Sequence, residues 1–240
     1  MHGLKDPVIS VHNFSKKYKD VFAVNNLSFS VFQGEVYGLI GPNGAGKTTT
    51  LNCLLGLIPE SSGTLQLFGS SLFSLDDPAK LVGVVRDPIG LEEKLSAKRV
   101  LSIAAIASGT SKSRVEEVIK QCGIDGFLKR RVDKLSTGQK QRLSIAVALL
   151  PNPKLLICDE PQNGLDAEGV IWFRKLIRNH ADKGGSVLLA THFLSEMEKM
   201  ADCLTILSTE VRFQGSVEEL TYDKTVSLED RYMQITGQEV

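Results

Sequence analysis

A glycine-rich loop followed by a lysine and three threonines is the clearest chemical signal in the sequence. The segment GPNGAGKT fits the spacing G-x-x-x-x-G-K-[ST] from Gly41 to Thr48. In such a loop, backbone N–H groups and a helix N-terminus hold phosphates, the lysine reaches the β- and γ-phosphates, and the threonine hydroxyl binds Mg²⁺. A glycine turn with a surface lysine is the alternative. The candidate phosphate-binding residues are Gly41, Pro42, Asn43, Gly44, Ala45, Gly46, Lys47, Thr48 and Thr49.

Two carboxylates follow a second apolar run, KLLICDEP. Ligands of parallel sheets bind beyond the carboxyl ends of the strands, so Asp159 could hold Mg²⁺ there. Glu160 could orient and polarise the water that attacks a γ-phosphate. Without the other motifs, the two residues could also be an Asp–Glu pair on the surface at the end of a strand, with no catalytic role. The phosphate loop favours the catalytic interpretation, because a hydrolase needs a metal ligand and a water-orienting group.

The segment LSTGQKQR predicts a second helix start that could accept an anion, since it opens a helical pattern and contains glycine. Its residues are Ser136, Thr137, Gly138 and Gln139. The first loop already provides a phosphate site. We therefore expect this second anion site to bind the nucleotide that is held by a neighbouring molecule.

Two further residues are candidates mainly because of these motifs. His192 follows the apolar run SVLLAT, where a histidine is usually structural but could contact a γ-phosphate. Tyr18 could stack on a flat base through its ring, or could simply be a tyrosine at a strand edge.

The elements that position these residues alternate along the chain. The period-two stretches VISVHNF and LSFSVF, with Leu27, Phe29 and Val31 on one face, predict a small antiparallel sheet. The apolar segments around residues 36–40 and the runs LVGVV, LLIC, SVLLA and CLTIL are separated by helical patterns, which favours a parallel sheet with crossover helices. One of these helices should span Lys47 to Leu57.

Between Leu91 and Lys134 the pattern is helical only. The first predicted helix has its apolar face at Val100, Ile103, Ala104 and Ala107. The second has Val115, Val118, Ile119 and Cys122, with a capping box from Ser113 to Glu116 and an end at Gly123. A basic cluster at residues 129–134 could meet a charged partner or be a solvated face.

Composition limits the function classes. The 240 residues suffice for one domain, and 28 basic and 28 acidic residues give zero formal net charge, so we expect no general attraction to nucleic acid. The four cysteines form no C-x-x-C pair, which is typical of a reduced, cytosolic protein. We expect neither a signal peptide nor a membrane span, because no apolar run reaches about 18 residues.

Taken in order, GPNGAGKT, LSTGQKQR, LLICDEP, GLD and TH resemble the ATP-binding cassette proteins, the nucleotide-binding subunits of ABC transporters. The resemblance covers the chain from about Tyr18 to Leu220. It implies an α/β fold: a P-loop NTPase (RecA-like) core with a small antiparallel β subdomain and an inserted α-helical subdomain. A single ABC ATPase domain would span residues 1–220, with the helical subdomain at about 91–150 and a C-terminal tail at 221–240.

The resemblance also implies roles and partners. Two ABC ATPase subunits, identical or different, would sandwich two ATP molecules with Mg²⁺, head to tail, and would drive a separate transmembrane permease at the cytoplasmic face of the cell membrane. Tyr18 would stack on adenine, Glu160 would be the catalytic base, and His192 would sense the γ-phosphate. Asp166 would belong to the loop that communicates between the two sites.

Two positions depart from the family pattern, and the second, Gln162 in place of the more usual Thr or Ser after DEP, should matter little. Most members carry Gln where this chain has Asp87, and that Gln reaches Mg²⁺ and the attacking water before leading into the segment that touches the permease. Asp87 is shorter and charged, which leaves its catalytic and metal-binding roles in question. An acidic residue here and the segment DEPQNGLDAEG resemble the subgroup that exports bacitracin and lantibiotic peptides.

Two other functions are left open by the sequence. A soluble ABC ATPase acting on DNA or ribosomes usually has a coiled-coil insertion, two cassettes or basic surfaces, and this chain has one cassette, no heptads and zero net charge. A regulatory cassette with weak turnover is the other alternative, because Asp87 would be a poor substitute for Gln.

Overall fold

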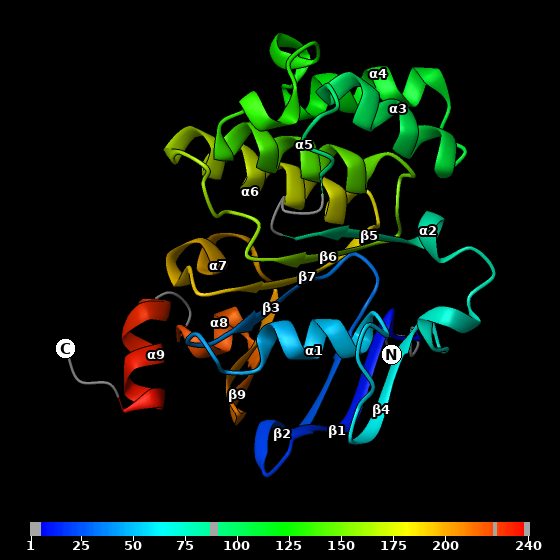
Figure 1. Cartoon of the computed structure of the whole chain (residues 1–240). Coiled ribbons are helices and arrows are strands. Elements are labelled where there is room, and N and C mark those ends of the chain that lie inside the picture. The colour runs from blue at the N-terminus through cyan, green and yellow to red at the C-terminus, as the bar shows by residue number, and fades with distance from the viewer. Residues whose placement is uncertain (1–5, 87–90, 223–224, 238–240) are drawn as a thin grey trace. The chain divides into compact units, whose positions relative to one another are not determined.

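The computed structural model describes residues 6–86, 91–222 and 225–237. The chain forms two compact units, which we treat separately (Figure 1). Unit 1 comprises Met1–Asp76 and Ile177–Val240, and unit 2 comprises Asp77–Leu176. In the part of the chain that the structure describes, no helix combines the length and the apolar character needed to cross a bilayer.

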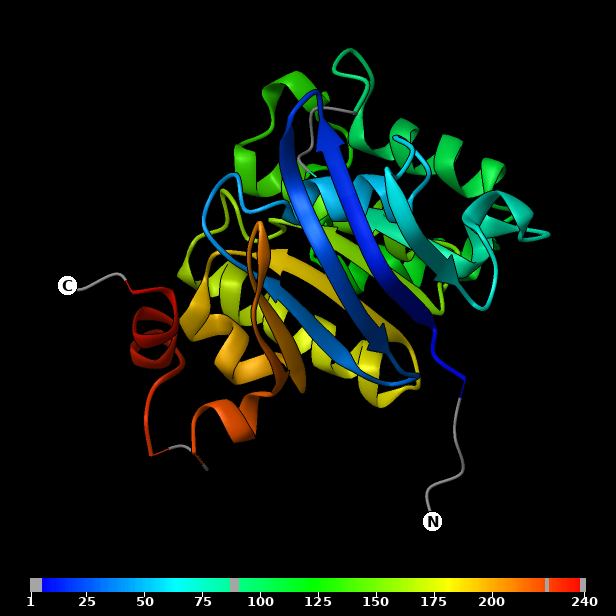
Figure 2. The same ribbon diagram turned by 90° about the horizontal axis from the view of Figure 1, so that it is seen from below.

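Unit 1 contains the predicted antiparallel sheet (Figure 2). Strand β1 (Ile9–Tyr18) lies between β2 (Val21–Val31) and β4 (Ser62–Leu67) and is antiparallel to both. The predicted inner face is confirmed, because Leu27, Phe29 and Val31 are all buried. Alternate side chains of a strand point to opposite faces, so this period-two pattern could be recognised in the sequence.

The second set of strands in unit 1 is centred on β3 (Val36–Ile40), which pairs in parallel with β7 (Ser186–Thr191) and β8 (Cys203–Ser208). Strand β9 (Glu210–Ser216) continues this set antiparallel to β8. All residues of β3 and β7 are buried, as expected of parallel strands. The expected strands at SVLLA and CLTIL are confirmed.

Helix α1 (Lys47–Leu54) follows β3 and is shorter than predicted. The chain leaves the helix before Leu57, and Gly56 adopts a left-handed conformation with φ of 64°. The other helices of unit 1 are short: a 3-10 turn at Leu72–Ser74, α7 (Leu194–Met200), α8 (Val217–Leu220) and α9 (Leu228–Thr236).

Helix α9 lies within the polar tail, for which the sequence offered no clear pattern. Its Leu228 and Tyr232 are buried, and the backbone N–H of Leu228 donates to Glu198 Oε2 of α7 at 2.8 Å. Buried apolar side chains and a hydrogen bond to α7 therefore hold this helix within unit 1.

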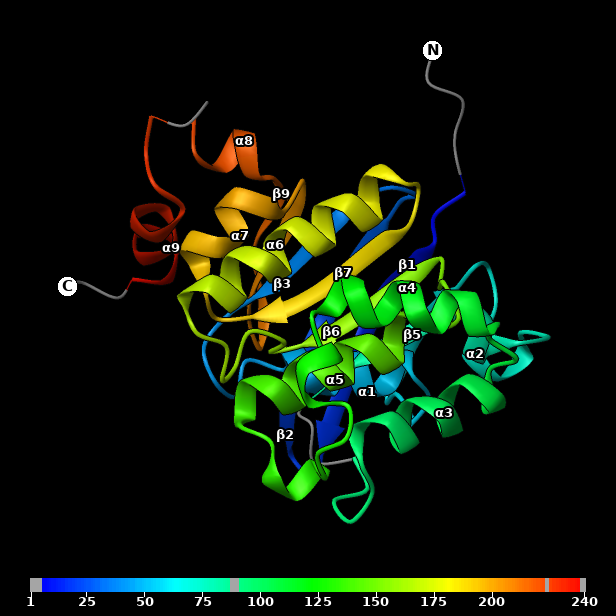
Figure 3. The same cartoon turned by 90° about the horizontal axis from the view of Figure 1, so that it is seen from above.

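Unit 2 pairs β5 (Val82–Val85) in parallel with β6 (Leu155–Asp159). Its helices are α2 (Pro78–Leu81), α3 (Ala97–Ala107), α4 (Lys112–Cys122) and α5 (Thr137–Leu149), with 3-10 turns at Asp125–Phe127 and Val132–Lys134 (Figure 3). Helix α6 (Ala167–Asp182) begins in unit 2 and ends among the residues of unit 1. The all-helical character predicted between Leu91 and Lys134 is confirmed for the described residues.

Two details of this helical region were predicted wrongly. Helix α4 starts at Ser111, whose hydroxyl accepts the N–H of Arg114 at 3.3 Å, and not at a box formed by Ser113 and Glu116. An N-cap needs only a side-chain oxygen at the turn, and Ser111 supplies it two residues earlier. Gly123 ends the helix as predicted, with φ of 62°.

The buried face of α3 was the second error. Ala97, Leu101 and Ala105 are its buried residues, while Ile103 of the predicted face is 47% exposed. Helix α3 packs against α5, and its buried residues are two alanines and a leucine. A sequence pattern shows that a helix is amphipathic but does not show which residues its neighbour can accommodate.

The cysteines behave as small buried hydrophobic residues. All four are free thiols, and Cys53, Cys122 and Cys158 are buried. Burial raises the pKa of Cys53 to about 11 and that of Cys122 to about 12, so both thiols stay protonated at neutral pH.

Candidate active site

The glycine-rich loop joins β3 to α1 in unit 1, as the sequence predicted. Gly44 and Gly46 have φ of 84° and 100°, a region that side chains rarely adopt. A Cβ atom on Gly46 would lie 2.4 Å from the carbonyl oxygen of Ala23, and one on Gly41 would lie 2.1 Å from that of Leu207. The loop therefore needs glycine both for its conformation and for its close approach to β2 and β8.

Lys47 is buried at the start of α1, and its ammonium group stays next to the loop. Its Nζ donates to the carbonyl oxygens of Gly41 at 2.8 Å and Pro42 at 3.2 Å. Thr48 is exposed in the first turn of the helix. A lysine ammonium and a helix N-terminus at one loop form a site that suits a phosphate.

The register of β3 and β7 places His192 at the same sheet edge as this loop. Ile40 pairs with Thr191, so the next residues, Gly41 and His192, leave the sheet side by side. The His192 side chain is exposed, and its ring lies 4.3 Å from that of Phe193 between centroids. The position fits the predicted phosphate contact, and that role stays a prediction.

Tyr18 is the last residue of β1 and pairs with Val21 across the hairpin. Its side chain is 49% exposed, and the Lys16 Nζ lies 5.1 Å from the ring centroid. The following strand, β2, is the one that Gly46 approaches at Ala23. The hairpin and the phosphate loop thus meet in unit 1, and Tyr18 offers an accessible aromatic face near one end of this contact.

The two predicted carboxylates lie at the end of β6 in unit 2. Asp159 is 8% exposed, and its Oδ2 lies 3.9 Å from a guanidinium nitrogen of Arg86. Glu160 has φ of 47°, a left-handed conformation that costs about 1 to 2 kcal/mol in a residue with a side chain. Such strain is common at functional sites, where the surrounding structure maintains it.

Arg86 was missed by the sequence analysis. Val85 pairs with Cys158, so the next residues, Arg86 and Asp159, lie at the same end of the two strands, and their side chains form an ion pair. A signal was present, because Arg86 directly follows an apolar strand that should lie beside another one. Asp87, a predicted catalytic and metal-binding residue, lies outside the described residues.

The signature segment begins α5 in unit 2. The Ser136 hydroxyl accepts the N–H of Gln139 at 3.2 Å, and Gln139 Oε1 accepts the N–H of Ser136 at 3.1 Å, which completes a capping box. Ser136 and Thr137 are exposed. Because the serine oxygen accepts this bond, its O–H proton can still be donated to another acceptor, such as a phosphate.

Asp166 caps the next helix. Its Oδ1 accepts the N–H of Gly169 at 2.7 Å, and its carbonyl oxygen accepts the N–H of Val170 at 2.9 Å. These bonds give Asp166 a structural role as the N-cap of α6. Its predicted role in communication between two sites stays a prediction.

The donor groups fit Mg²⁺. Asp159 supplies a carboxylate in unit 2 and Thr48 a hydroxyl in unit 1, and hard oxygen ligands are those that Mg²⁺ prefers. Among the described residues, no group of three or more His, Cys, Asp or Glu side chains could hold a metal by itself. Each group is of a type that Mg²⁺ binds alongside waters and nucleotide phosphates, and the metal-binding roles of Thr48 and Asp159 stay predictions.

Comparison with known proteins identifies the family. Residues 24–163 match the family model described as ABC transporter. The lantibiotic transport ATP-binding protein SrtF of Streptococcus pyogenes is 34% identical over 94% of this chain and 96% of its own length. The bacitracin transport ATP-binding protein BcrA of Bacillus licheniformis is 36% identical over 95% of this chain and 74% of its own length.

Solved structures agree with this result. An ATP-binding subunit of an ABC transporter superimposes with a TM-score of 0.86 at 28% identity, covering 95% of this chain and 99% of that one. A dimeric ATP-binding cassette in a post-hydrolysis state, bound to ADP and Pi, gives a TM-score of 0.76 at 25% identity, covering 87% of this chain and 98% of that one. These matches confirm the predicted P-loop NTPase fold class. The chain belongs to the ABC transporter family, and it is an ATP-binding ATPase of that family.

Proposed function

We propose that this ATPase powers a separate membrane permease that exports a peptide antibiotic or an amphipathic drug, and that it binds the permease at the cytoplasmic face of the cell membrane. The observation that carries this proposal is the similarity to SrtF over nearly the whole length of both chains. The similarity to BcrA supports the same substrate class. No observation on the described residues favours a nucleic-acid partner.

The working unit is a head-to-tail pair of ATPase subunits, identical or different. Each ATP with its Mg²⁺ lies between the loop from Gly41 to Thr49 of one subunit and the signature segment, Ser136 to Gln139, of the other. Exposure of Ser136 and its free capacity to donate a hydrogen bond support this arrangement. The dimeric cassette bound to ADP and Pi supports it as well.

The pair converts ATP binding into closure because the closed state offers each nucleotide two sets of contacts. Shifting an equilibrium from 1:99 to 99:1 takes about 5.5 kcal/mol of differential affinity. A charge-assisted hydrogen bond contributes about 1.5 to 3 kcal/mol, so a few contacts from the signature segment to the γ-phosphate suffice. Hydrolysis removes these contacts, and the pair reopens.

Individual residues have distinct roles in this cycle. Tyr18 stacks on the adenine, Lys47 contacts the β- and γ-phosphates, and Glu160 orients and deprotonates the attacking water. His192 contacts the γ-phosphate from the neighbouring strand end. Thr48 and Asp159 hold Mg²⁺, which when bound neutralises charge on the phosphates.

The variant Glu160→Gln tests the assignment of the base. It retains the size and hydrogen-bonding capacity of the residue but cannot accept the proton, so ATP binding should persist while turnover falls by at least a hundredfold. The ATP-bound dimer should then accumulate, as measured by size-exclusion chromatography with light scattering. Glu116→Gln, an exposed change on α4, is the matched control and should hydrolyse ATP normally. Turnover by Glu160→Gln near the parent rate would show that another residue is the base.

Purification from membranes tests the transporter proposal independently. Tagged protein isolated in mild detergent should retain a multi-span membrane protein, and ATP hydrolysis by that complex should respond to a peptide antibiotic. Copurification of nucleic acid or ribosomes without a membrane protein would instead support the alternative of a soluble ATPase.

A further inference from the structure

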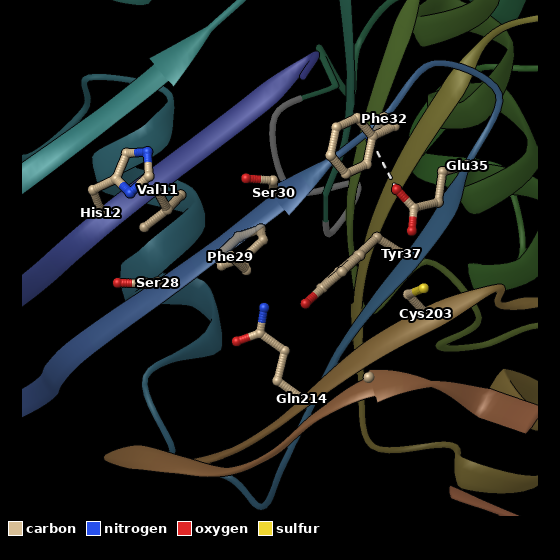
Figure 4. A pocket seen from close by; sticks show the side chains of 11 residues that line it. Val11, His12, Ser28, Phe29, Ser30, Phe32, Glu35, Tyr37, Cys203 and Gln214 are labelled. Carbon is tan, nitrogen blue, oxygen red and sulfur yellow. Dashed lines mark hydrogen bonds between the residues drawn. The ribbon is translucent and has the colours of Figure 1, made fainter. Parts of the chain in front are cut away.

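A pocket of about 450 Å³ lies in unit 1, and none of the residues that line it is predicted to bind ATP (Figure 4). Strands β1, β2, β3, β8 and β9 and the turn between β2 and β3 all contribute residues to it. Neither Tyr18 nor any residue of the phosphate loop lines it. Its volume falls within the range of sites that hold small ligands.

Besides the imidazole of His12, three aromatic rings line this pocket. Phe29 of β2 and Tyr37 of β3 stack with 5.2 Å between ring centroids and an angle of 20° between planes, and both are almost fully buried. Phe32, the first residue after β2, is 44% exposed and adds a third ring. The Tyr37 hydroxyl is paired with Thr205 at 2.7 Å, which fixes the ring. The negative face of an aromatic ring attracts cations within about 6 Å.

A carboxylate lines the same pocket. One oxygen of Glu35 accepts the backbone N–H of Phe32 at 2.7 Å, so the side chain is held in place. Glu35 takes part in no ion pair within the described residues, and no described lysine or arginine lines the pocket. The neighbouring carboxylate, Asp202, differs because it is paired with Arg178 at 2.9 Å.

Burial raises the pKa of Glu35, and the nearby Asp202 raises it further, while hydrogen bonds from Phe32 and Cys203 lower it. The pocket thus contains an acidic group whose charged form is destabilised by its surroundings. A positive charge placed beside it would stabilise that form.

We propose that this pocket binds a small, weakly hydrated organic cation, with its positive group beside Glu35 and its apolar part against the rings of Phe29, Phe32 and Tyr37. A hydrated metal ion is the poorer fit, because aromatic rings cannot replace its water ligands. Ser28, Ser30 and Gln214 add polar groups that a substituent of the ligand can reach. The proposal does not depend on the transported substrate or on the permease.

Two ligands of the same shape show whether binding depends on the positive charge. They are choline and the neutral dimethylbutanol, in which carbon replaces the ammonium nitrogen. Each is titrated into the full-length protein, with binding followed by ligand-observed saturation-transfer NMR. Choline should bind in the millimolar range, and dimethylbutanol should bind at least tenfold more weakly.

Four variants complete the test. Glu35→Gln and Phe32→Ala should each weaken choline binding about tenfold, and Glu35→Gln should leave binding of the neutral molecule unchanged. Glu218→Gln and Phe73→Ala, exposed positions of unit 1 outside the pocket, are the controls and should bind choline as the parent does. ATP binding should be unchanged in all four, which verifies folding. The proposal fails if choline does not bind, if both ligands bind equally, or if Glu35→Gln binds choline like the parent.

Discussion

Gly138 of the signature segment lies directly against Gly164: a Cβ atom on Gly138 would come within 2.9 Å of the Gly164 carbonyl oxygen. On the other side of this contact, a Cβ atom on Gly164 would meet Thr137 Cγ2 at 2.4 Å. The segment that begins α5 and the segment that leads to Asp166 therefore touch through two glycines. The contact leaves no room for a side chain at either glycine.

The variant Gly164→Ala should destabilise the protein by about 1 to 3 kcal/mol, because the new methyl group clashes with Thr137 and the residue has φ of 77°. Urea unfolding followed by circular dichroism measures this loss. Gly126→Ala is the matched control in the same unit, since nothing lies within 4 Å of a Cβ atom at Gly126. Equal stability of the two variants would contradict the contact.

The signature segment can be tested with two serines that have the same structural role. Ser136 caps α5 and Ser111 caps α4, each accepting the backbone N–H three residues later. Ser136→Arg and Ser111→Arg should lose similar stability, about 1 kcal/mol, because each loses an N-cap. Only Ser136→Arg should also abolish most ATP hydrolysis, measured as phosphate release. If both variants hydrolyse ATP alike, Ser136 does not contact a nucleotide.

Arg142 and Trp172 hold α4, α5 and α6 together in unit 2. The Arg142 guanidinium lies 4.1 Å from the Trp172 ring centroid and donates to the Cys122 carbonyl at 3.2 Å, while Trp172 Nε1 donates to the Gln121 carbonyl at 3.0 Å. Lysine cannot stack as a planar group, so Arg142→Lys should cost about 1 kcal/mol. Trp172 is the single tryptophan, and its fluorescence should change in this variant. Arg99→Lys on the exposed side of α3 should alter neither the stability nor the emission.

Glu35 gives a pH dependence of stability with a defined sign. Its folded-state pKa lies above the ordinary value of 4.5, mainly because of burial, so the folded state binds this proton more tightly than the unfolded state does. This contribution to stability is complete below pH 4.5 and is lost as the pH rises through the folded-state pKa. Glu35→Gln should remove this loss of stability at high pH. Unfolding curves from pH 4 to pH 8 should therefore show that the free energy of unfolding of the variant, relative to the parent, increases toward pH 8. If the difference in free energy of unfolding between Glu35→Gln and the parent is the same at every pH in this range, the pKa of Glu35 is not raised in the folded state.

The sequence alone predicted several features whose signal is local. The spacing from Gly41 to Thr48, the period-two face of β2 and the left-handed end of α4 at Gly123 depend on backbone conformations set within a few residues. The order of the motifs was likewise sufficient to indicate the family. The N-cap of α4 was misplaced because two serines, two residues apart, satisfy the same local rule.

Only the tertiary structure decided which residues from different strands lie side by side. The register between Ile40 and Thr191 places His192 next to Gly41, and the pairing of Val85 with Cys158 joins Arg86 to Asp159. The pocket around Glu35 combines three strands from the beginning of the chain, β1 to β3, with β8 and β9, which are distant from them in the sequence. Contacts of this kind arise from packing between segments that are independent along the chain, so no local spacing encodes them.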